Sequence, residues 1–152
     1  MSQENVEIVR RYFEAVKRGL DVHWENPRSV AAAMSTDDLT PAQREVLGFT
    51  HVDVEWRNAF GLIFKGQLDF AKGVDQLLEA TNDFWIVDVQ EVTDLGSDRV
   101  LAVVKSAMKG KDSEIEVSQT VFSLMTLRDG LIVRAEEYLH REEALEAAGL
   151  RE

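Results

Sequence analysis

Four strand-like segments follow one another in the second half of this 152-residue chain, with short turns between them. They span residues 84–93, 98–109, 113–127 and 131–139. The turn before the last segment is Asp129-Gly130, a dipeptide typical of tight hairpins because both residues tolerate the positive φ that such turns require. Consecutive strands with short connections pair antiparallel. This half of the chain therefore predicts an antiparallel meander of long strands.

The first half of the chain predicts helices. Residues 3–18 place apolar side chains on one half of a helical wheel and charged side chains on the other. Gly19 predicts the end of this helix. Two short helices are expected at 27–34 and 41–48, because a capping residue precedes proline at the start of each. The remaining expected elements are a strand at 50–57, a short strand within 61–66, a helix at 68–81 and a short C-terminal helix that ends at Gly149.

Helices followed by a run of antiparallel strands form the pattern of an α+β fold. We expect a strongly curved antiparallel sheet wrapped around the N-terminal helices, with a ligand pocket between sheet and helices. The chain contains no internal repeat, low-complexity tract or Pro/Gly-rich linker, so residues 1–152 are expected to form a single domain.

Charge and composition narrow the possible partners. The net charge is −11 and Lys and Arg are not clustered, so binding to nucleic acids or to anionic membranes is disfavoured. No apolar run reaches the ~20 residues of a membrane-spanning helix, and the charged N-terminus does not resemble a signal peptide. The chain lacks cysteine. Together these features favour a cytoplasmic protein whose partners are small molecules or a second copy of itself.

The sequence carries no signal for a metal or a cofactor. Its three histidines are scattered, without the i, i+4 spacing of helical metal ligands. A glycine-rich phosphate-binding loop is absent as well. We therefore expect a cofactor-free site.

Both ends of the chain resemble the SnoaL-like family of the nuclear transport factor 2-like superfamily, through MSQENVEIVRRYFEAVKRG and MTLRDGLIVRAEEYLHREEALEAAGL. The segments VDVEW, FKG and VTDLGSDRVLAVV lie between them in family order. The resemblance covers nearly the whole chain. It implies a cone-shaped fold with a bent sheet around a cavity, and often a homodimer formed through the outer face of the sheet. It says less about function, since the superfamily includes ketosteroid isomerases, polyketide cyclases, epoxide hydrolases, dehydratases and non-catalytic domains.

Alternation along THVDVEWR assigns the two faces of the strand at 50–57. Val52, Val54 and Trp56 share one face, and Asp53 and Glu55 lie on the other. The apolar face should point inward, because burying unpaired carboxylates is costly. The resemblance places Trp56 where ketosteroid isomerases keep their general-base aspartate. It implies that this base is missing here.

The strand at 113–127 turns its more apolar side inward, with Gln119 and Ser123 as polar exceptions on that side. The resemblance aligns Ser123 with a position where isomerases place a protonated aspartate. A serine can donate a hydrogen bond there, but it does not titrate near neutral pH.

Glu137 is the carboxylate that the resemblance directs into the cavity from the last strand. An apolar pocket would raise the pKa of Glu137 and suit it to proton transfer. Alternatively, Glu137 pairs with an arginine at the cavity edge or caps a helix. Tyr12 aligns with the helix-1 tyrosine that isomerases use as an oxyanion donor, although an aromatic residue there can also serve packing alone.

Two functional hypotheses follow. In the first, a small apolar ligand with a carbonyl, hydroxyl or epoxide group binds in the cavity and undergoes proton transfer, with Glu137 as the base. The expected lining residues are Tyr12, Trp56, Phe60, Phe84 or Trp85, Gln119, Ser123 and Glu137. In the second, the domain binds a ligand without catalysis or serves as a dimeric structural module. A homodimer would also cover the outward-facing apolar residues Phe122, Leu124, Ile132 and Tyr138.

Overall fold

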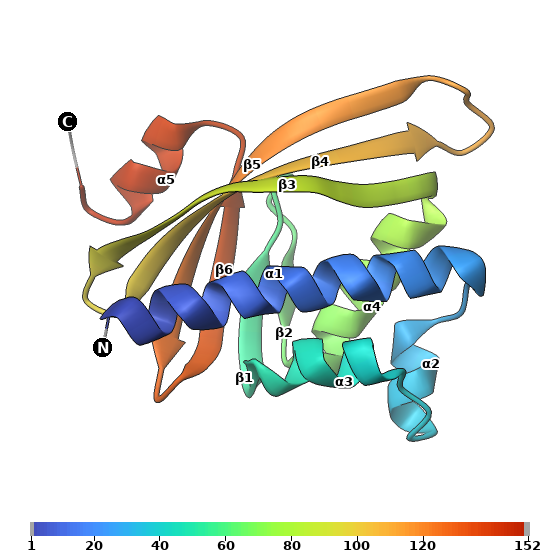
Figure 1. Ribbon diagram of the computed structural model, residues 1–152, viewed down its shortest axis with the longest axis horizontal. Coiled ribbons are helices and arrows are strands. Elements are labelled where there is room, and N and C mark those ends of the chain that lie inside the picture. The colour runs from blue at the N-terminus through green and yellow to red at the C-terminus, as the bar shows by residue number, and fades with distance from the viewer. Residues whose placement is uncertain (1, 151–152) are drawn as a thin grey trace.

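Helix α1 (Ser2–Glu25) lies across one face of a six-stranded sheet in the computed structural model, which describes residues 2–150 (Figure 1). The other helices are α2 (Val30–Ser35), α3 (Pro41–Gly48), α4 (Gln67–Glu79) and α5 (Arg141–Ala147). The strands are β1 (Thr50–Arg57), β2 (Ile63–Lys65), β3 (Thr81–Gly96), β4 (Arg99–Gly110), β5 (Glu116–Arg128) and β6 (Leu131–Tyr138). The α+β class and the curved sheet covered by the N-terminal helices are confirmed.

The strand order in the sheet is β2-β1-β6-β5-β4-β3. Strands β3 to β6 form the predicted antiparallel meander, and β1 pairs antiparallel with β2. Only the β1–β6 pairing is parallel in the described sheet. This pairing joins the two halves of the chain and brings Trp56 of β1 beside Ala135 of β6.

The main core lies between the sheet and helices α1, α3 and α4. It is built from the apolar stripe of α1 and from the inward side chains of the strands, as the helical and alternating patterns predicted. Within residues 2–150, no helix is long and apolar enough to cross a membrane.

Helix α1 continues past Gly19, where its end was predicted. The next turn is stabilised by tertiary contacts, since Leu20 is buried and the Trp24 indole Nε1 donates a hydrogen bond to the Phe84 carbonyl at 2.7 Å. Gly19 also faces α3, where an added Cβ would lie 3.8 Å from the Ala42 Cβ. These contacts outweigh the roughly 1 kcal/mol that glycine costs within a helix.

The two short helices differ in how well their starts were predicted. Helix α3 begins as expected, with a reciprocal capping box between Thr40 and Gln43. Helix α2 begins at Val30 rather than at residue 27, because Ser29 is its N-cap. The Asp75 carboxylate on α4 also accepts the Val30 backbone N–H at 2.7 Å and so anchors α2 to α4.

Two bulges overturn parts of the predicted face assignment. Val54 and Trp56 are buried as expected, but Val52 is 63% exposed because the β1–β6 register shifts between Thr50 and Glu55. Ile132, predicted to face outward, belongs to the main core and is 1% exposed. Ile132 lies in β6, which pairs with β5 through a second register shift at the Leu127–Ile132 pair. An extra residue in one strand breaks the two-residue alternation from which the two faces of each strand were predicted.

The outer face of the sheet is covered in part by α5. Phe122 and Tyr138 pack with Leu145 of α5 in a second cluster, and Leu124 is 1% exposed. The apolar residues that favoured a homodimer are therefore shielded within one chain, and that physical argument no longer holds. The homodimer stays a prediction of the resemblance.

Candidate functional site

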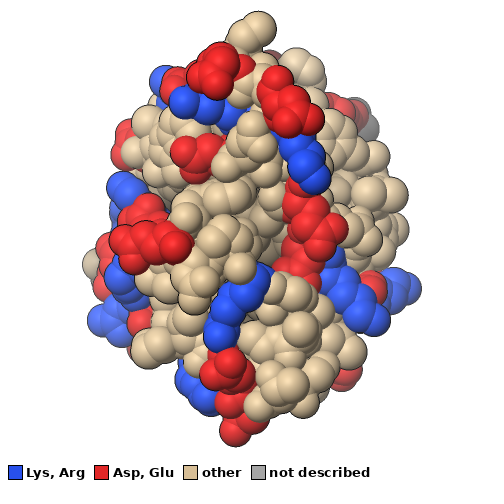
Figure 2. All heavy atoms as spheres, turned by 90° about the vertical axis from the view of Figure 1, so that its right-hand side faces the viewer, with Lys and Arg blue, Asp and Glu red and all other residues tan. Residues whose placement is uncertain are grey.

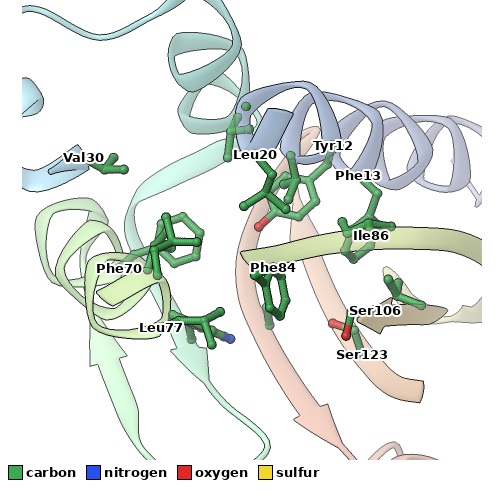
Figure 3. Close-up of a pocket in the computed structure, with 18 of the residues that line it drawn as sticks. Tyr12, Phe13, Leu20, Val30, Phe70, Leu77, Phe84, Ile86, Ser106 and Ser123 are labelled. Atoms are coloured by element: carbon green, nitrogen blue, oxygen red, sulfur yellow. The ribbon is translucent and has the colours of Figure 1, made fainter. Parts of the chain in front are cut away.

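A cavity of about 200 Å³ lies between the sheet and helices α1 to α4 (Figure 3). Helix α1 contributes Tyr12, Val16, Gly19 and His23, which recur every three or four residues and so form one stripe along the helix. Phe70, Ala71, Val74, Leu77 and Leu78 line it from α4. The walls are mainly aromatic and aliphatic.

The sheet supplies the opposite wall through alternate residues. These are Phe84 and Ile86 of β3, Val104 and Ser106 of β4, Val121, Ser123 and Met125 of β5, and Ala135 and Glu137 of β6. Ser123 and Glu137 are direct cross-strand partners, so their side chains emerge side by side. The inward orientations of Ser123, predicted from alternation, and of Glu137, implied by the resemblance, thus agree with the structure at this point of the sheet.

Glu137 is held at the cavity by two donors from the β1 side. The Trp56 indole N–H and the Ala59 backbone N–H donate hydrogen bonds to its carboxylate. Burial among apolar side chains raises the pKa of Glu137 to about 7, although both hydrogen bonds favour the ionised form and lower it. Part of the side chain stays accessible because it lines the cavity. Glu137 can therefore either accept or donate a proton near neutral pH.

Tyr12 interacts electrostatically with the Glu137 carboxylate. Burial raises the pKa of the Tyr12 hydroxyl well above its ordinary range, and the negative charge of Glu137 raises it further. The hydroxyl therefore stays protonated and can donate or accept a hydrogen bond. Tyr12, Trp56, Ser123 and Glu137, all predicted from the sequence, line the same cavity.

Trp56 occupies a tightly packed position between β1 and α4. Its ring stacks on Phe64 with centroids 5.2 Å apart and meets the Phe70 ring edge-on at 5.3 Å. A Cβ added at Gly73 of α4 would lie 2.8 Å from Trp56 Cζ3, so only glycine lets the helix approach this closely. The indole is thereby fixed where its N–H meets Glu137. The sequence predicted Trp56 as a wall residue but gave no signal for this hydrogen bond.

Two predicted ligand-binding residues are not among those that line the cavity. Phe60 is 77% exposed, because the Asn58 side chain accepts the Phe60 and Leu62 backbone N–H groups and closes a loop that turns Phe60 outward. Gln119 lies beside Ser106 on the β4–β5 pair, but it is not a wall residue. Of the alternatives Phe84 and Trp85, Phe84 lines the cavity.

His23 also lines the cavity, from the part of α1 that continues past Gly19. Burial lowers its pKa, while the nearby Asp75 carboxylate raises it. Its Nδ1 atom is buried without a hydrogen-bond partner among the described residues. Extending the α1 stripe from Tyr12 past Gly19 would have revealed this position. His140 precedes α5 as its N-cap, without a side-chain hydrogen bond to the helix.

The polar residues of THVDVEWR lie outside the cavity, as alternation predicted. Asp53 is exposed, and its backbone N–H donates to His51 Nδ1 at 3.0 Å. Glu55 forms ion pairs on the outer face of the sheet with Arg134 at 3.3 Å and with Lys65 at 3.9 Å. Among residues 2–150, no three His, Asp or Glu side chains are placed to hold a metal ion together.

Comparison with known proteins bears on the architecture. No family model matches the chain, and no curated protein matches it. Solved structures do match. An NTF2-like protein from Burkholderia xenovorans has a TM-score of 0.62 at 21% identity, with 97% of each chain covered. The present chain has the nuclear transport factor 2-like fold.

Two further structures with this fold carry functional names. A putative polyketide cyclase from Xanthomonas campestris pv. campestris matches with a TM-score of 0.66 at 19% identity, covering 93% of this chain and 94% of the other. An LEH-like epoxide hydrolase from M. tuberculosis matches with a TM-score of 0.61 at 12% identity, covering 95% and 89%. At these identities the similarity establishes the nuclear transport factor 2-like fold, and function has to be argued from the site.

Proposed function

We propose that the protein binds a small apolar, oxygen-bearing molecule in the cavity and transfers a proton to or from it through Glu137. The observation that carries this proposal is that Glu137, with a pKa of about 7, is the one carboxyl group among residues 2–150 on the wall of a mainly apolar cavity. A general acid or base is most effective when its pKa lies near the working pH. The cyclase and epoxide hydrolase with the same fold support a reaction of this broad kind.

The neighbouring groups have distinct roles in this proposal. Trp56 and the Ala59 backbone N–H orient the carboxylate, which leaves its remaining lone pairs for the ligand. Tyr12 and Ser123 supply hydroxyl groups that can hydrogen-bond a ligand carbonyl, hydroxyl or epoxide oxygen. The apolar walls exclude water, which strengthens each of these interactions. Isomerisation, cyclisation, dehydration and hydrolysis are the reactions that this set of groups can support.

Glu137→Gln is the direct test of this proposal. Wild type and variant would be assayed against apolar ketones, hydroxyketones and epoxides, with ligand binding followed separately by calorimetry. We expect the variant to lose turnover while apolar ligands still bind, because glutamine keeps the shape but cannot transfer the proton. Unchanged turnover in the variant would remove Glu137 from the mechanism.

Ligand binding without chemistry is the second candidate function. It is favoured by Trp56 at the position where isomerases keep their base and by Ser123, whose hydroxyl does not titrate near neutral pH. Binding of apolar ligands with no turnover of any of them in the wild-type protein would favour this alternative. A cytoplasmic location and a homodimeric state also belong to the proposal, and sedimentation at micromolar concentration would test the latter.

A further inference from the structure

The cavity lining contains an acidic side chain but no Lys or Arg among the described residues. Among residues 2–150, its titratable side chains are Tyr12, His23 and Glu137. A ligand carboxylate or phosphate would meet no permanently cationic partner and would approach a group that is itself anionic when ionised. Burying an anion without a partner is costly. The lining therefore disfavours anionic ligands and leaves neutral and cationic ones.

The polar side chains of Glu137, Tyr12 and Ser123 at the cavity can all accept hydrogen bonds. Glu137 receives its two protein donors from the β1 side, and its other lone pairs stay available to a ligand. Tyr12 and Ser123, which are 8% and 2% exposed, also present hydroxyl oxygens to the cavity. A head group with several N–H donors and a positive charge would satisfy these oxygens together. An ammonium group has three such donors.

Aromatic rings surround the same space. Tyr12, Phe13, Trp56, Phe70 and Phe84 all line the cavity (Figure 3 labels four of them). Ring faces attract cations, most strongly that of tryptophan, and the attraction grows when the cation is desolvated. The negative charge of Glu137 and the attraction of the ring faces would therefore both offset the desolvation cost of a bound ammonium.

We propose that the ligand of this cavity is a small apolar amine, whose protonated nitrogen pairs with Glu137 while its hydrocarbon part contacts the aromatic and aliphatic walls. The inference rests on the proposed function for the cavity as a binding site and specifies the chemical class of its ligand. An oxygen function on the same molecule would reach Tyr12 or Ser123.

The surface and the overall charge are compatible with entry of a cation. Figure 2 shows the end of the molecule where the C-terminal part of α1, α2 and the start of β3 meet, with an uncharged centre and charged side chains around it. His23, Val30 and Phe84 line the cavity from these elements. The net charge of −11 attracts cations and repels anions at long range.

Three ligands that share one ring and differ in head group test this inference. Benzylamine, benzyl alcohol and benzoate would be titrated into the protein at about pH 7.5, with binding followed by NMR shifts of cavity residues. We expect benzylamine to bind at least tenfold more tightly than benzyl alcohol, and benzoate to be the weakest. The affinities themselves should be modest, with Kd on the order of millimolar, since ligands of this size have few atoms.

Glu137→Gln and Glu55→Gln form a matched pair for the same titrations. Both remove one negative charge, but Glu55 lies on the outer face of the sheet in ion pairs with Arg134 and Lys65. We expect Glu137→Gln to reduce benzylamine binding to the level of benzyl alcohol. Glu55→Gln should leave the ranking of the three ligands unchanged.

The ranking of the three ligands tests the inference, and whether any of them binds tests the proposed function. Equal or tighter binding of benzyl alcohol or benzoate by the wild-type protein would overturn the amine assignment while the cavity remained a ligand site. A preference for benzylamine that survives in Glu137→Gln would overturn the role of Glu137 in that preference. Binding of none of the three ligands would contradict both the inference and the proposed binding function. The comparison in the wild-type protein does not depend on how well either variant folds.

Discussion

Glu136 and Glu137 are neighbours in sequence but lie in opposite environments. Glu136 faces the outer side of the sheet, where Arg134 lies 3.6 Å away and the Tyr138 hydroxyl donates a hydrogen bond at 2.9 Å. Glu137 faces the cavity, where its partners are the uncharged N–H groups of Trp56 and Ala59. The side chain of Glu136 is only 15% exposed, so burial alone does not distinguish the two. The difference is that Glu136 has a cationic partner, Arg134, whereas the partners of Glu137 are uncharged. Glu137 is therefore the carboxyl group available for chemistry.

The largest expected effect concerns stability as a function of pH. The pKa of Glu137 is about 7 in the folded protein against an ordinary glutamate value of 4.5, so the folded state binds the proton more tightly. Its stabilising contribution is fully present below about pH 4.5 and is lost as the pH rises through about 7. The loss amounts to roughly 3 kcal/mol.

Glu137→Gln should remove this dependence, because glutamine resembles the protonated acid at every pH. Relative to wild type, we expect the variant to have similar stability near pH 4 and to be more stable by roughly 3 kcal/mol near pH 8. Urea unfolding at both pH values measures the difference. A wild-type protein that gains stability over this interval relative to Glu137→Gln would contradict the account of the site.

A smaller effect on stability is expected from a substitution at Gly73, which packs against the ring of Trp56, the hydrogen-bond donor to Glu137. Gly73→Ala places a Cβ 2.8 Å from Trp56 Cζ3 and 3.0 Å from the Phe64 ring, so α4 or the indole must shift. We expect a loss of about 1–3 kcal/mol in the free energy of unfolding. Denaturant titration measures it.

Gly48→Ala is the control for this substitution. Gly48 also lies in a helix, but an added Cβ there meets no atom within 4 Å. We expect it to be neutral or to stabilise the protein by up to about 1 kcal/mol. Equal losses from the two alanine substitutions would show that close packing at Trp56 is unimportant.

The smallest effect is expected on the outer face. Glu136→Gln removes one ion pair with Arg134 and weakens the hydrogen bond from Tyr138, both at the edge of solvent. The Arg134 side chain is 51% exposed, so solvent screens this ion pair and limits its contribution to about 0–1 kcal/mol. Thermal unfolding should therefore change little. Turnover and ligand binding should be unaffected. A loss of function as large as that of Glu137→Gln would mean that the two faces are not independent.

The fold was predictable because its signals are local. Alternation and turn dipeptides identified the four long strands, and the apolar stripe identified α1. The errors arose where tertiary contacts outweighed local preference. Gly19 does not end α1, because Leu20 and Trp24 are held by the core and by β3. Bulges moved Val52 outward and Ile132 inward, and neither bulge has a mark in the sequence.

The candidate site was predictable in part. Glu137, Tyr12, Trp56 and Ser123 were placed by the resemblance together with strand alternation, and all four line the cavity. Phe60 was misplaced because its orientation depends on the loop that Asn58 closes. The hydrogen bond from Trp56 to Glu137 joins two strands that are distant in sequence and pair in parallel, so no local pattern reports it.

The central claim is that Glu137 is a carboxyl group poised to exchange a proton near neutral pH. A titration of its side-chain carboxyl carbon by NMR, assigned by comparison with Glu137→Gln, tests this directly. We predict a midpoint at a pKa of about 7. A midpoint at or below about 4.5, the ordinary range of glutamate, would contradict the account.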